Sequence, residues 1–229
     1  MARHAGQSIA GFHLHPDLCR MIATKDVEPF SLERRFLMNP HVRKFQSIAP
    51  FYGLFFKPQV LYYSRIIEKH ISELNLAGCE TILDLGSGTG AFARCWQDLG
   101  YSVTAVDASP AMVRLCLRNG LKCLEQDVLR GLNFPDNSFD VVVGAYVAHG
   151  FPFADREKLY RESARVSKDL VLFHDFGGKP SFSVSVIEKM EGSCYKEFIS
   201  RAPGEMKEFF RRVDVLSFSS WNRWYICRP

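Results

Sequence analysis

The run ILDLGSGTG, residues 82–90, constrains the fold of this chain more than any other segment. Its apolar start predicts a buried strand ending near Asp84, and three glycines at alternate positions then lead into a helical pattern. Glycine allows a sharp turn and lets a ligand approach the backbone without a Cβ in the way. The start of the following helix offers unpaired N–H groups to polar ligand atoms. The run therefore predicts a ligand-binding turn between a buried strand and a helix.

Strands and helices are predicted to alternate from residue 80 onward. Strand-like runs cover residues 81–85, 102–107, 121–127, 139–147 and 170–176. Helical runs cover residues 91–100, 109–120 and 154–167, and the second of these has Ser109 at its N-cap, Pro110 in its first turn and Gly120 past its end. Such alternation gives a parallel sheet with helices on both faces.

The last two strand-like runs, residues 213–220 and 224–229, follow each other without a helix between them. Two strands joined by a short turn must run antiparallel. The expected fold class is therefore α/β, with a doubly wound, mostly parallel seven-stranded sheet that ends in an antiparallel pair of strands.

The expected organisation is an N-terminal extension over residues 1–45 and a main domain over residues 46–229. Residues 46–78 are aromatic-rich and predict a helical cap of one or two helices, broken near Pro58. Residues 176–210 are expected to form a short cap over the substrate. His4, His13, His15 and Cys19 lie in the extension, but no second cysteine accompanies Cys19 there, and a metal site is not the favoured interpretation.

Composition excludes several classes of protein. The net charge of +4 is small, and no dense run of lysine and arginine indicates a nucleic-acid binder. The longest apolar stretches fall far short of the ~20 residues of a membrane span, and no secretory signal is expected. The 7 cysteines are scattered without a CxxC pair, which argues against a disulfide framework and a zinc site. A reducing, cytoplasmic setting is the expectation.

Three aspartates follow the predicted strands at the edge where a ligand would bind. Asp107 ends the second strand, where a carboxylate can accept hydrogen bonds from both hydroxyls of a ribose. Asp127 follows the third strand and is placed to contact an adenine amino group. Asp84 precedes the glycines and suits an amino-acid ammonium better than a pyrophosphate, because a carboxylate repels phosphates.

These residues and the order of the strands resemble the class I S-adenosylmethionine-dependent methyltransferase family over roughly residues 53–229. The run LNFPDNSFDVVV before the fourth strand and the closing antiparallel pair match the family as well. The run IAPFYGLFF, residues 48–56, is similar to the entry helix of the ubiquinone and menaquinone methyltransferase branch. In that branch a tyrosine at the position of Tyr52 closes over the methionine end of the cofactor. This chain has Gly53 where the branch usually has aspartate.

The resemblance implies S-adenosylmethionine as the cofactor and S-adenosylhomocysteine as its product. The glycine loop would lie under the methionine portion, Asp84 would orient the ammonium, and Asp107 would hold the ribose. The cofactor-binding residues implied in this way are Tyr52, Asp84, Gly86, Ser87, Gly88, Gly90, Asp107, Ala108, Met112, Asp127, Val128, Ala145 and Tyr146.

The methyl acceptor is expected to be a small molecule, and a general base is needed only if it reacts through a hydroxyl or an acidic carbon. The candidate catalytic residues are His149, His174 and Asp175, after the fourth strand and at the end of the fifth. His149 resembles a histidine that commonly follows the fourth strand in this family without acting as a base. Strand alternation sends one of His174 and Asp175 toward the pocket and the other away. Candidates for an apolar acceptor wall are Tyr52, Phe55, Phe56, Phe151, Phe153 and Tyr195.

Three other functions compete with small-molecule methyl transfer. A nicotinamide-dependent oxidoreductase of the short-chain type would carry a Tyr-x-x-x-Lys pair, which does not occur in this chain. A nucleic-acid methyltransferase for exocyclic amines would carry an Asn/Asp-Pro-Pro-aromatic run where this chain has GAYVAH. A non-catalytic protein that binds the cofactor or a partner is the third alternative, and it would keep the same glycine loop and carboxylates.

Overall fold

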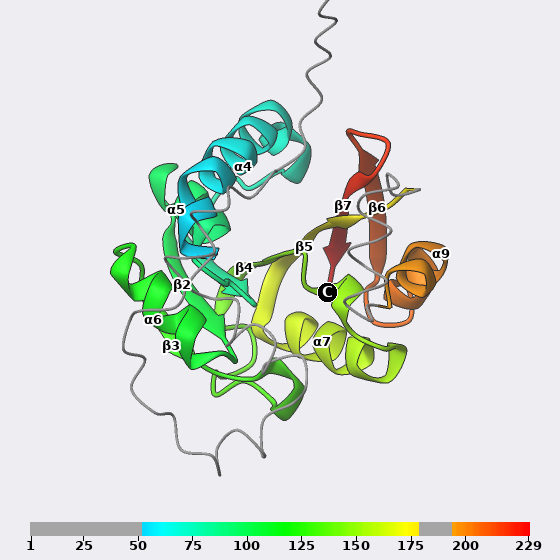
Figure 1. Ribbon diagram of the computed structural model, residues 1–229. Helices are drawn as coiled ribbons and strands as arrows, with labels where there is room; N and C mark the ends of the chain where they lie inside the picture. The colour runs from blue at the N-terminus through cyan, green and yellow to red at the C-terminus, as the bar shows by residue number, and fades with distance from the viewer. Residues whose placement is uncertain (1–51, 179–193) are drawn as a thin grey trace, which may run out of the picture. The chain divides into compact units, whose positions relative to one another are not determined.

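A computed structural model describes residues 52–178 and 194–229 of the chain. The seven strands form one sheet in the order β3-β2-β1-β4-β5-β7-β6 (Figure 1). They are β1 (Thr81–Leu85), β2 (Ser102–Asp107), β3 (Cys123–Glu125), β4 (Phe139–Ala145), β5 (Ser167–Phe176), β6 (Arg212–Ser217) and β7 (Asn222–Arg228). Strands β1 to β5 are parallel, and β7 pairs antiparallel with β5 and β6. The predicted fold class is confirmed.

Five α-helices and four short 3-10 turns accompany the sheet in the described ranges. The helices are α4 (Phe56–His70), α5 (Ala91–Asp98), α6 (Pro110–Arg118), α7 (Phe153–Val166) and α9 (Tyr195–Met206). The turns are η2 (Gly53–Phe55), η3 (Ile71–Leu74), η4 (Val128–Arg130) and η5 (Ala148–Gly150). Ser109 caps α6 as predicted, because its side chain accepts a hydrogen bond from the Met112 N–H and Pro110 occupies the first turn.

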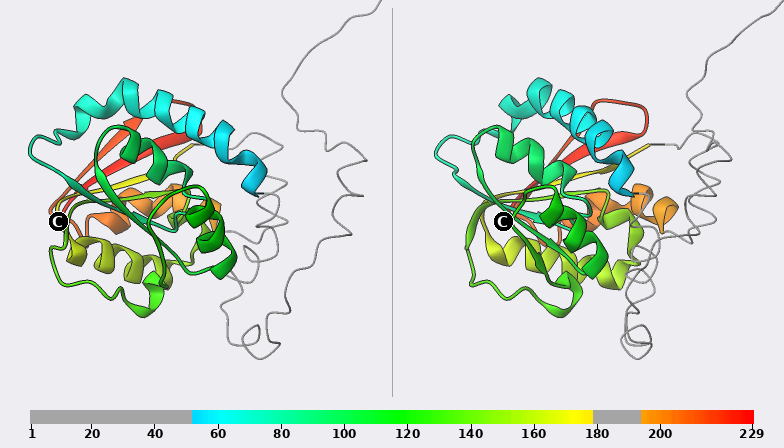
Figure 2. Two further views of the ribbon diagram at one scale, coloured as in Figure 1. Left: turned by 90° about the vertical axis from the view of Figure 1, so that its left-hand side faces the viewer. Right: turned by 60° about the vertical axis from the view of Figure 1, so that its left-hand side comes forward.

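Residue alternation along the central strands divides the core into two layers. Ile82, Val141 and Leu170 contact the layer that contains α4 and α5, whereas Leu83 and Val142 contact the layer that contains α7 and α9. Figure 2 shows α4 on one side of the strands and α7 on the other. Burial on both faces explains why the strands read as continuous apolar runs.

Two sequence expectations about element boundaries are wrong. Pro58 does not break the N-terminal helix, because it is the third residue of α4, where a helix has no acceptor for a backbone N–H. The boundary expected between the helical run 154–167 and the strand-like run 170–176 is also misplaced. Helix α7 ends at Val166, and β5 begins at the next residue, with an irregular register between Phe139 and Val141 where β4 pairs with it.

The expected cap regions are described only in part. Residues 1–45, and residues 46–51 of the expected helical cap, lie outside the described residues. So do residues 179–193 of the expected substrate cap. The remainder of that cap contains α9, whose Phe198, Ala202 and Met206 are fully buried in the same core cluster as Phe173 of β5. Helix α9 is thus a core element.

Arg156 joins α7 to α9 inside this core. Its fully buried guanidinium donates to both carboxylate oxygens of Glu205 at 2.8 and 2.7 Å, to the Phe151 carbonyl at 2.6 Å and to Glu197 at 3.3 Å. A bidentate pair of this kind fixes geometry as well as charge. Arg156 therefore ties α9 to the backbone at Phe151, just before α7.

We predict that Arg156→Met lowers the free energy of unfolding by about 3–5 kcal/mol, because Glu205 is left buried without its main partner. Arg201→Met is the matched control, since Arg201 contacts the same two glutamates from a side chain that is 58 % exposed. Combining Arg156→Met with Glu205→Met is expected to recover most of the loss. Denaturant unfolding measures all three variants, and equal effects for the two single arginine variants would contradict the prediction.

Candidate cofactor and catalytic site

The glycine loop follows β1 at the carboxyl edge of the sheet. Gly90 has a φ of 82°, and a Cβ there would lie 2.2 Å from Leu121 Cδ1 and 2.7 Å from Cys116 Sγ. Gly88 has a φ of 55°, and a Cβ there would meet nothing within 4 Å. The loop is therefore packed tightly against α6 and the residues before β3 at Gly90, and it borders open space at Gly88.

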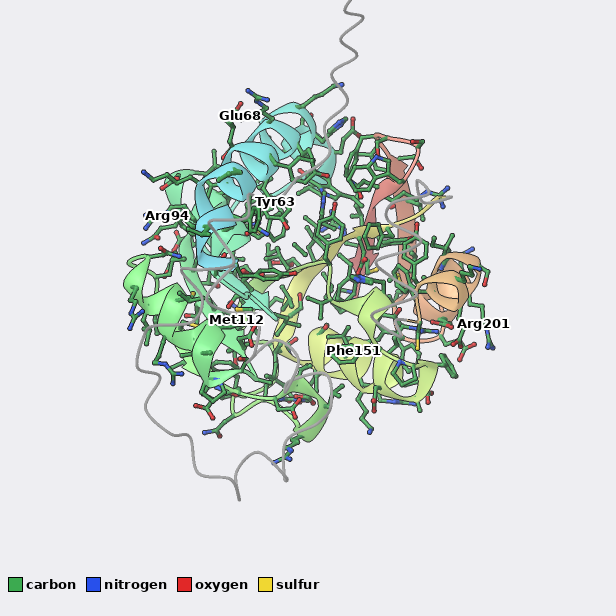
Figure 3. All side chains as sticks on the ribbon, in the orientation of Figure 1. Tyr63, Glu68, Arg94, Met112, Phe151 and Arg201 are labelled. Atoms are coloured by element: carbon green, nitrogen blue, oxygen red, sulfur yellow. The ribbon has the colours of Figure 1, made fainter. Side chains whose placement is uncertain are left out.

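A cavity of about 390 Å³ lies at this edge of the sheet. Twelve of the thirteen residues predicted to bind the cofactor line it, and Gly90 is the exception. Gly90 instead packs behind the loop, for the steric reason given above. Tyr63, Met112 and Phe151, labelled in Figure 3, reach the cavity from α4, from α6 and from the residues before α7, whereas Glu68 and Arg201 point outward.

Asp84 is the most unusual residue of the cavity. Its side chain is fully buried, and neither carboxylate oxygen has a hydrogen-bond partner among the described residues. Burial raises the pKa of Asp84 well above its usual value, and the nearby Ala93 N–H in the first turn of α5 offsets only part of this. A buried, unpartnered carboxylate facing a cavity is suited to receive a cation or strong hydrogen-bond donor from a ligand.

Asp107 lies at the end of β2 across the loop from Asp84. Its Oδ2 accepts the Gly88 N–H at 2.9 Å, and its Oδ1 accepts the Ser109 N–H at 2.8 Å. Burial nevertheless raises the pKa of Asp107 to about 6. Each oxygen keeps a further lone pair, so the carboxylate can also accept from two neighbouring hydroxyls.

Asp127 lines the cavity but is also used by the fold. Its Oδ1 accepts the Leu129 N–H at 3.0 Å and thereby caps the turn η4, and its Oδ2 lies 3.5 Å from Arg130 Nε. The neighbouring Val128 also lines the cavity, as do Ala108 and Met112. Together these residues form a wall that offers apolar contacts and one carboxylate. Such a wall suits the flat ring and the amino group of a nucleobase.

His149 and Asp175, two of the three candidate catalytic residues, form a pair. His149 lines the cavity, and its Nδ1 lies 2.8 Å from Asp175 Oδ1. Asp175 is itself 1 % exposed and does not line the cavity. Strand alternation therefore sends Asp175 to the side of η5, where it contacts His149.

His174, the third candidate, is not in the cavity. It lies on the opposite face of β5, where its ring is fully buried, packs against Tyr63 and accepts a hydrogen bond from Trp224 Nε1 at 3.0 Å on Nδ1. Burial lowers the pKa of His174 to about 3, so the ring is neutral near pH 7. This placement keeps His174 out of the cavity, so it does not support a catalytic role for His174. The ring is part of the packed core instead.

Tyr146 adopts a backbone conformation that is rare for a tyrosine, with a φ of 56°. This turn follows β4 and brings the tyrosine hydroxyl to 2.9 Å from Asn222 Oδ1 and 3.2 Å from the Tyr62 hydroxyl. The Asn222 side-chain amide also donates to Tyr62. Tyr146 therefore links α4 to β7 beneath the cavity that it lines.

The predicted apolar wall is found in part. Tyr52 and Phe151 line the cavity, whereas Phe55, Phe56 and Phe153 do not. Tyr195 contacts the ring of Phe176, a cavity residue, at 4.7 Å between centroids. Sequence reasoning missed eleven lining residues, most of which sit beside predicted ones: Gln59, Tyr63, Thr89, Ala91, Phe92, Val106, Ser109, Gln126, Leu129, Val147 and Phe176.

Comparison with known proteins finds similarity to methyltransferases. Residues 83–173 match the family described as "Methyltransferase domain". The "Uncharacterized methyltransferase YcgJ" of Bacillus subtilis (strain 168) is 34% identical over 93 residues, which are 38% of this chain and 36% of that protein. The "Demethylmenaquinone methyltransferase" of Corynebacterium urealyticum is 34% identical over 134 residues, which are 56% of this chain and 53% of that protein. The chain thus spans about a third to a half of these curated relatives' length.

Solved structures share the fold. Magnesium protoporphyrin IX methyltransferase from Synechocystis PCC 6803 with bound SAH aligns over 93% of both chains, with a TM-score of 0.53 and 16% identity. A putative S-adenosyl-L-methionine-dependent methyltransferase from Methanococcus maripaludis covers 80% of this chain and 92% of its own, with a TM-score of 0.58 and 19% identity.

The sheet order, the antiparallel closing strands and the matched segment define the class I S-adenosylmethionine-dependent methyltransferase fold. The chain has this fold, as the sequence predicts, and within the class it resembles the quinone methyltransferase branch. No group of metal-ligating side chains and no helix able to cross a membrane occurs within residues 52–178 and 194–229.

We predict that Asp84→Asn stabilises the ligand-free protein, because it removes a carboxylate that is buried without a partner. A gain of about 1–2 kcal/mol corresponds to about 2–8 °C in the melting temperature of a chain of this size. Asp98→Asn, on the 57 % exposed side chain at the end of α5, is the control and should change little. Calorimetric melting of the ligand-free variants decides the point, and a lower melting temperature for Asp84→Asn would contradict it.

The two raised pKa values predict that affinity for S-adenosylhomocysteine falls in acid. Asp107 and Asp84 must both be ionised to accept the ligand's donors, and Asp107, with a pKa of about 6, is half protonated near pH 6. Protonation of Asp107 alone is expected to weaken affinity by about tenfold per pH unit below that value, and protonation of Asp84 acts in the same direction. Without ligand the sign is opposite, because the folded state holds these protons more tightly and gains stability as the pH falls from 6 toward 4. Titration calorimetry from about pH 5 to 7 tests this, and a constant affinity would refute it.

Proposed function

We propose that this chain is an S-adenosylmethionine-dependent methyltransferase that acts on a small-molecule acceptor. The observation that carries the proposal is Asp84, a buried carboxylate that has no hydrogen-bond partner in the described part of the chain, lies beside the glycine loop and faces the same cavity as Asp107. An amino acid joined to a ribose carries an ammonium for the first carboxylate and a pair of hydroxyls for the second.

The residues fit the cofactor along its length. Asp84 would bind the ammonium, the loop from Gly86 to Gly88 would lie under the methionine portion, and Asp107 would hold the ribose. Ala108, Met112, Asp127 and Val128 would contact the adenine, while Ala145 and Tyr146 would line the sulfonium side under the closing Tyr52. A bound S-adenosylmethionine supplies a methyl group already activated by a positively charged sulfur.

The main task of this protein's residues is then to position the acceptor. Alignment of two reactants in one cavity can contribute ~7–11 kcal/mol in favourable cases. Tyr146 is held by Asn222 and Tyr62 from two other elements, so the wall beside the reacting groups is rigid.

A small-molecule acceptor is supported by the aromatic residues in the cavity lining and by the similarity to demethylmenaquinone methyltransferases. The described cysteines are all free, which supports the proposed reducing, cytoplasmic setting. For the organisation of the chain we propose an N-terminal extension over residues 1–45, a helical cap over residues 46–78 and a substrate cap within residues 176–210.

Two alternatives, a nicotinamide-dependent oxidoreductase and a non-catalytic cofactor-binding protein, differ from the proposed function in the ligand or in turnover. A nicotinamide-dependent oxidoreductase would place phosphates against the buried Asp84, which repels them. A non-catalytic cofactor-binding protein would share every cofactor contact and would differ only in methyl transfer, which a labelled methyl donor detects.

We expect S-adenosylmethionine and S-adenosylhomocysteine to raise the melting temperature and NAD to leave it unchanged. Ligand at about 100 times its dissociation constant stabilises a protein by about 2.7 kcal/mol. Asp107→Ala should abolish the response, because the ribose loses its acceptor, whereas Asp98→Ala should retain it. Thermal shifts of the three proteins measure this, and a response to NAD alone would overturn the proposed function.

A further inference from the structure

Two buried thiols lie next to each other where α6 approaches β3. Cys116 is in α6 and Cys123 is the first residue of β3, and their side chains are hydrogen-bonded to each other. Cys116 is fully buried, and Cys123 is 6 % exposed. Cys95, by contrast, contacts the Ser64 hydroxyl and backbone carbonyls. Two adjacent thiols can be joined by oxidation, which a single buried thiol cannot undergo.

The pair lies directly behind the glycine loop. The Ser87 hydroxyl is 4.0 Å from Cys116 Sγ and 3.7 Å from Cys123 Sγ. A Cβ on Gly90 would lie 2.7 Å from Cys116 Sγ. Ser87 lines the cavity, whereas neither cysteine does. Two residues of the loop therefore pack against the thiols from the side that faces away from the cavity.

The proposed methyl transfer does not use these thiols. Both belong to a small core cluster whose other members are Ala93, Ala105, Val113 and Leu121. Packing at such a site requires small apolar side chains, which cysteine provides. The pairing adds reactivity to this packing role. The hydrogen bond from Cys116 lowers the pKa of Cys123, so Cys123 carries the more reactive thiolate of the two.

We propose that Cys116 and Cys123 are a modification site, where hydrogen peroxide forms a disulfide behind the glycine loop and thereby weakens ligand binding. The effect on binding rests on the proposed function, whereas formation of the disulfide does not.

The oxidation proceeds in two steps. In the first, the Cys123 thiolate attacks a peroxide oxygen, the O–O bond breaks, and hydroxide leaves from the sulfenic acid that forms on Cys123. In the second, the Cys116 sulfur attacks the Cys123 sulfur, the S–O bond breaks, and water leaves with the Cys116 thiol proton. The proton released earlier by Cys123 neutralises the hydroxide. Two thiols are thus oxidised by two electrons, and one peroxide is reduced to two waters.

Burial of the pair selects the oxidant and links the reaction to the cavity. A bulky disulfide cannot reach thiols that are enclosed in a core cluster, whereas hydrogen peroxide is little larger than water. Ser87 contacts both thiols and borders the cavity, so a ligand that covers the loop also covers this approach. We therefore expect S-adenosylhomocysteine to slow the oxidation.

The disulfide changes the support of the loop. A disulfide requires a distance of about 2.05 Å between its sulfurs, and it removes both thiol hydrogens. Ser87 then loses its present partners, and Gly90 loses the sulfur that packs against it. Because coupling between two sites is reciprocal, a ligand that favours the reduced loop must bind the oxidised protein less tightly. Couplings of this kind are typically about 5–150-fold.

The first test detects the bond itself. Trypsin cleaves after Arg118 and Lys122, so residues 115–118 and 123–130 fall into separate peptides. After mild peroxide treatment and blocking of free thiols, mass spectrometry should show these two peptides joined, and dithiothreitol should separate them. Cys116→Ala should yield no joined peptide, whereas Cys79→Ala, which alters a partly exposed cysteine outside the cluster, should behave as wild type. Free thiols, or sulfinic acids without a joined peptide, overturn the proposal.

The second test measures the affinity of the same samples for S-adenosylhomocysteine by titration calorimetry. We expect oxidised wild type to bind about 5–150-fold more weakly than reduced wild type, and dithiothreitol to restore the affinity. Peroxide should leave the affinity of Cys116→Ala and Cys123→Ala unchanged.

The outcomes separate this inference from the proposed function. A joined peptide with unchanged S-adenosylhomocysteine affinity would overturn the effect on binding and leave the cofactor assignment intact. An equal loss of affinity on peroxide treatment in wild type and in both alanine variants would trace the loss to other residues and overturn the proposal. If reduced wild type fails to bind S-adenosylhomocysteine, the proposed function itself is refuted, and the weakening of ligand binding is refuted with it.

Discussion

Burying a carboxylate without a hydrogen-bond partner costs free energy, and Asp84 is such a group among the described residues. The fold around Asp84 keeps the carboxylate away from solvent. The strand β1 lies in the middle of the parallel part of the sheet, with β2 and β4 on either side, so its last polar residue cannot reach solvent. The glycine loop turns away immediately afterward and leaves the carboxylate facing the cavity. The folded protein is more stable when a cationic ligand fills such a site than when the site is empty. The cost of burying the carboxylate in the ligand-free protein therefore becomes part of the affinity for the ligand.

The fold could be predicted almost completely because its elements carry strong local signals. Strands buried on both faces are continuous apolar runs, and helix α6 has a cap, a proline and a glycine at the expected positions. Errors arose where tertiary pairing decides the boundary. Ser167 follows a helix and precedes charged residues, so only its pairing with Phe139 across β4 makes it part of a strand.

Most residues that line the cavity near the glycine loop could also be predicted, because the loop and the carboxylates at successive strand ends are visible in the sequence. The acceptor side could not. Alternation shows that His174 and Asp175 face opposite ways, but the direction depends on which layer each face of β5 contacts. Likewise, the sequence does not distinguish Gly90 from Gly88, because both belong to the same glycine-rich run. Only the close approach of Cys116 and Leu121, which are distant in sequence, shows that Gly90 packs behind the loop.

The pairing of Arg156 with Glu205 has a consequence for how this protein can be divided. The segment that matches the methyltransferase family ends at residue 173, whereas the carboxylate that neutralises Arg156 lies on α9, more than thirty residues later. A fragment cut at the family boundary would keep a buried cation and lose its counter-charge, together with the strand β7 that covers β5. The recognisable part of the chain is therefore not an independent folding unit, and shortened versions made for crystallisation or fusion should retain the chain through Arg228.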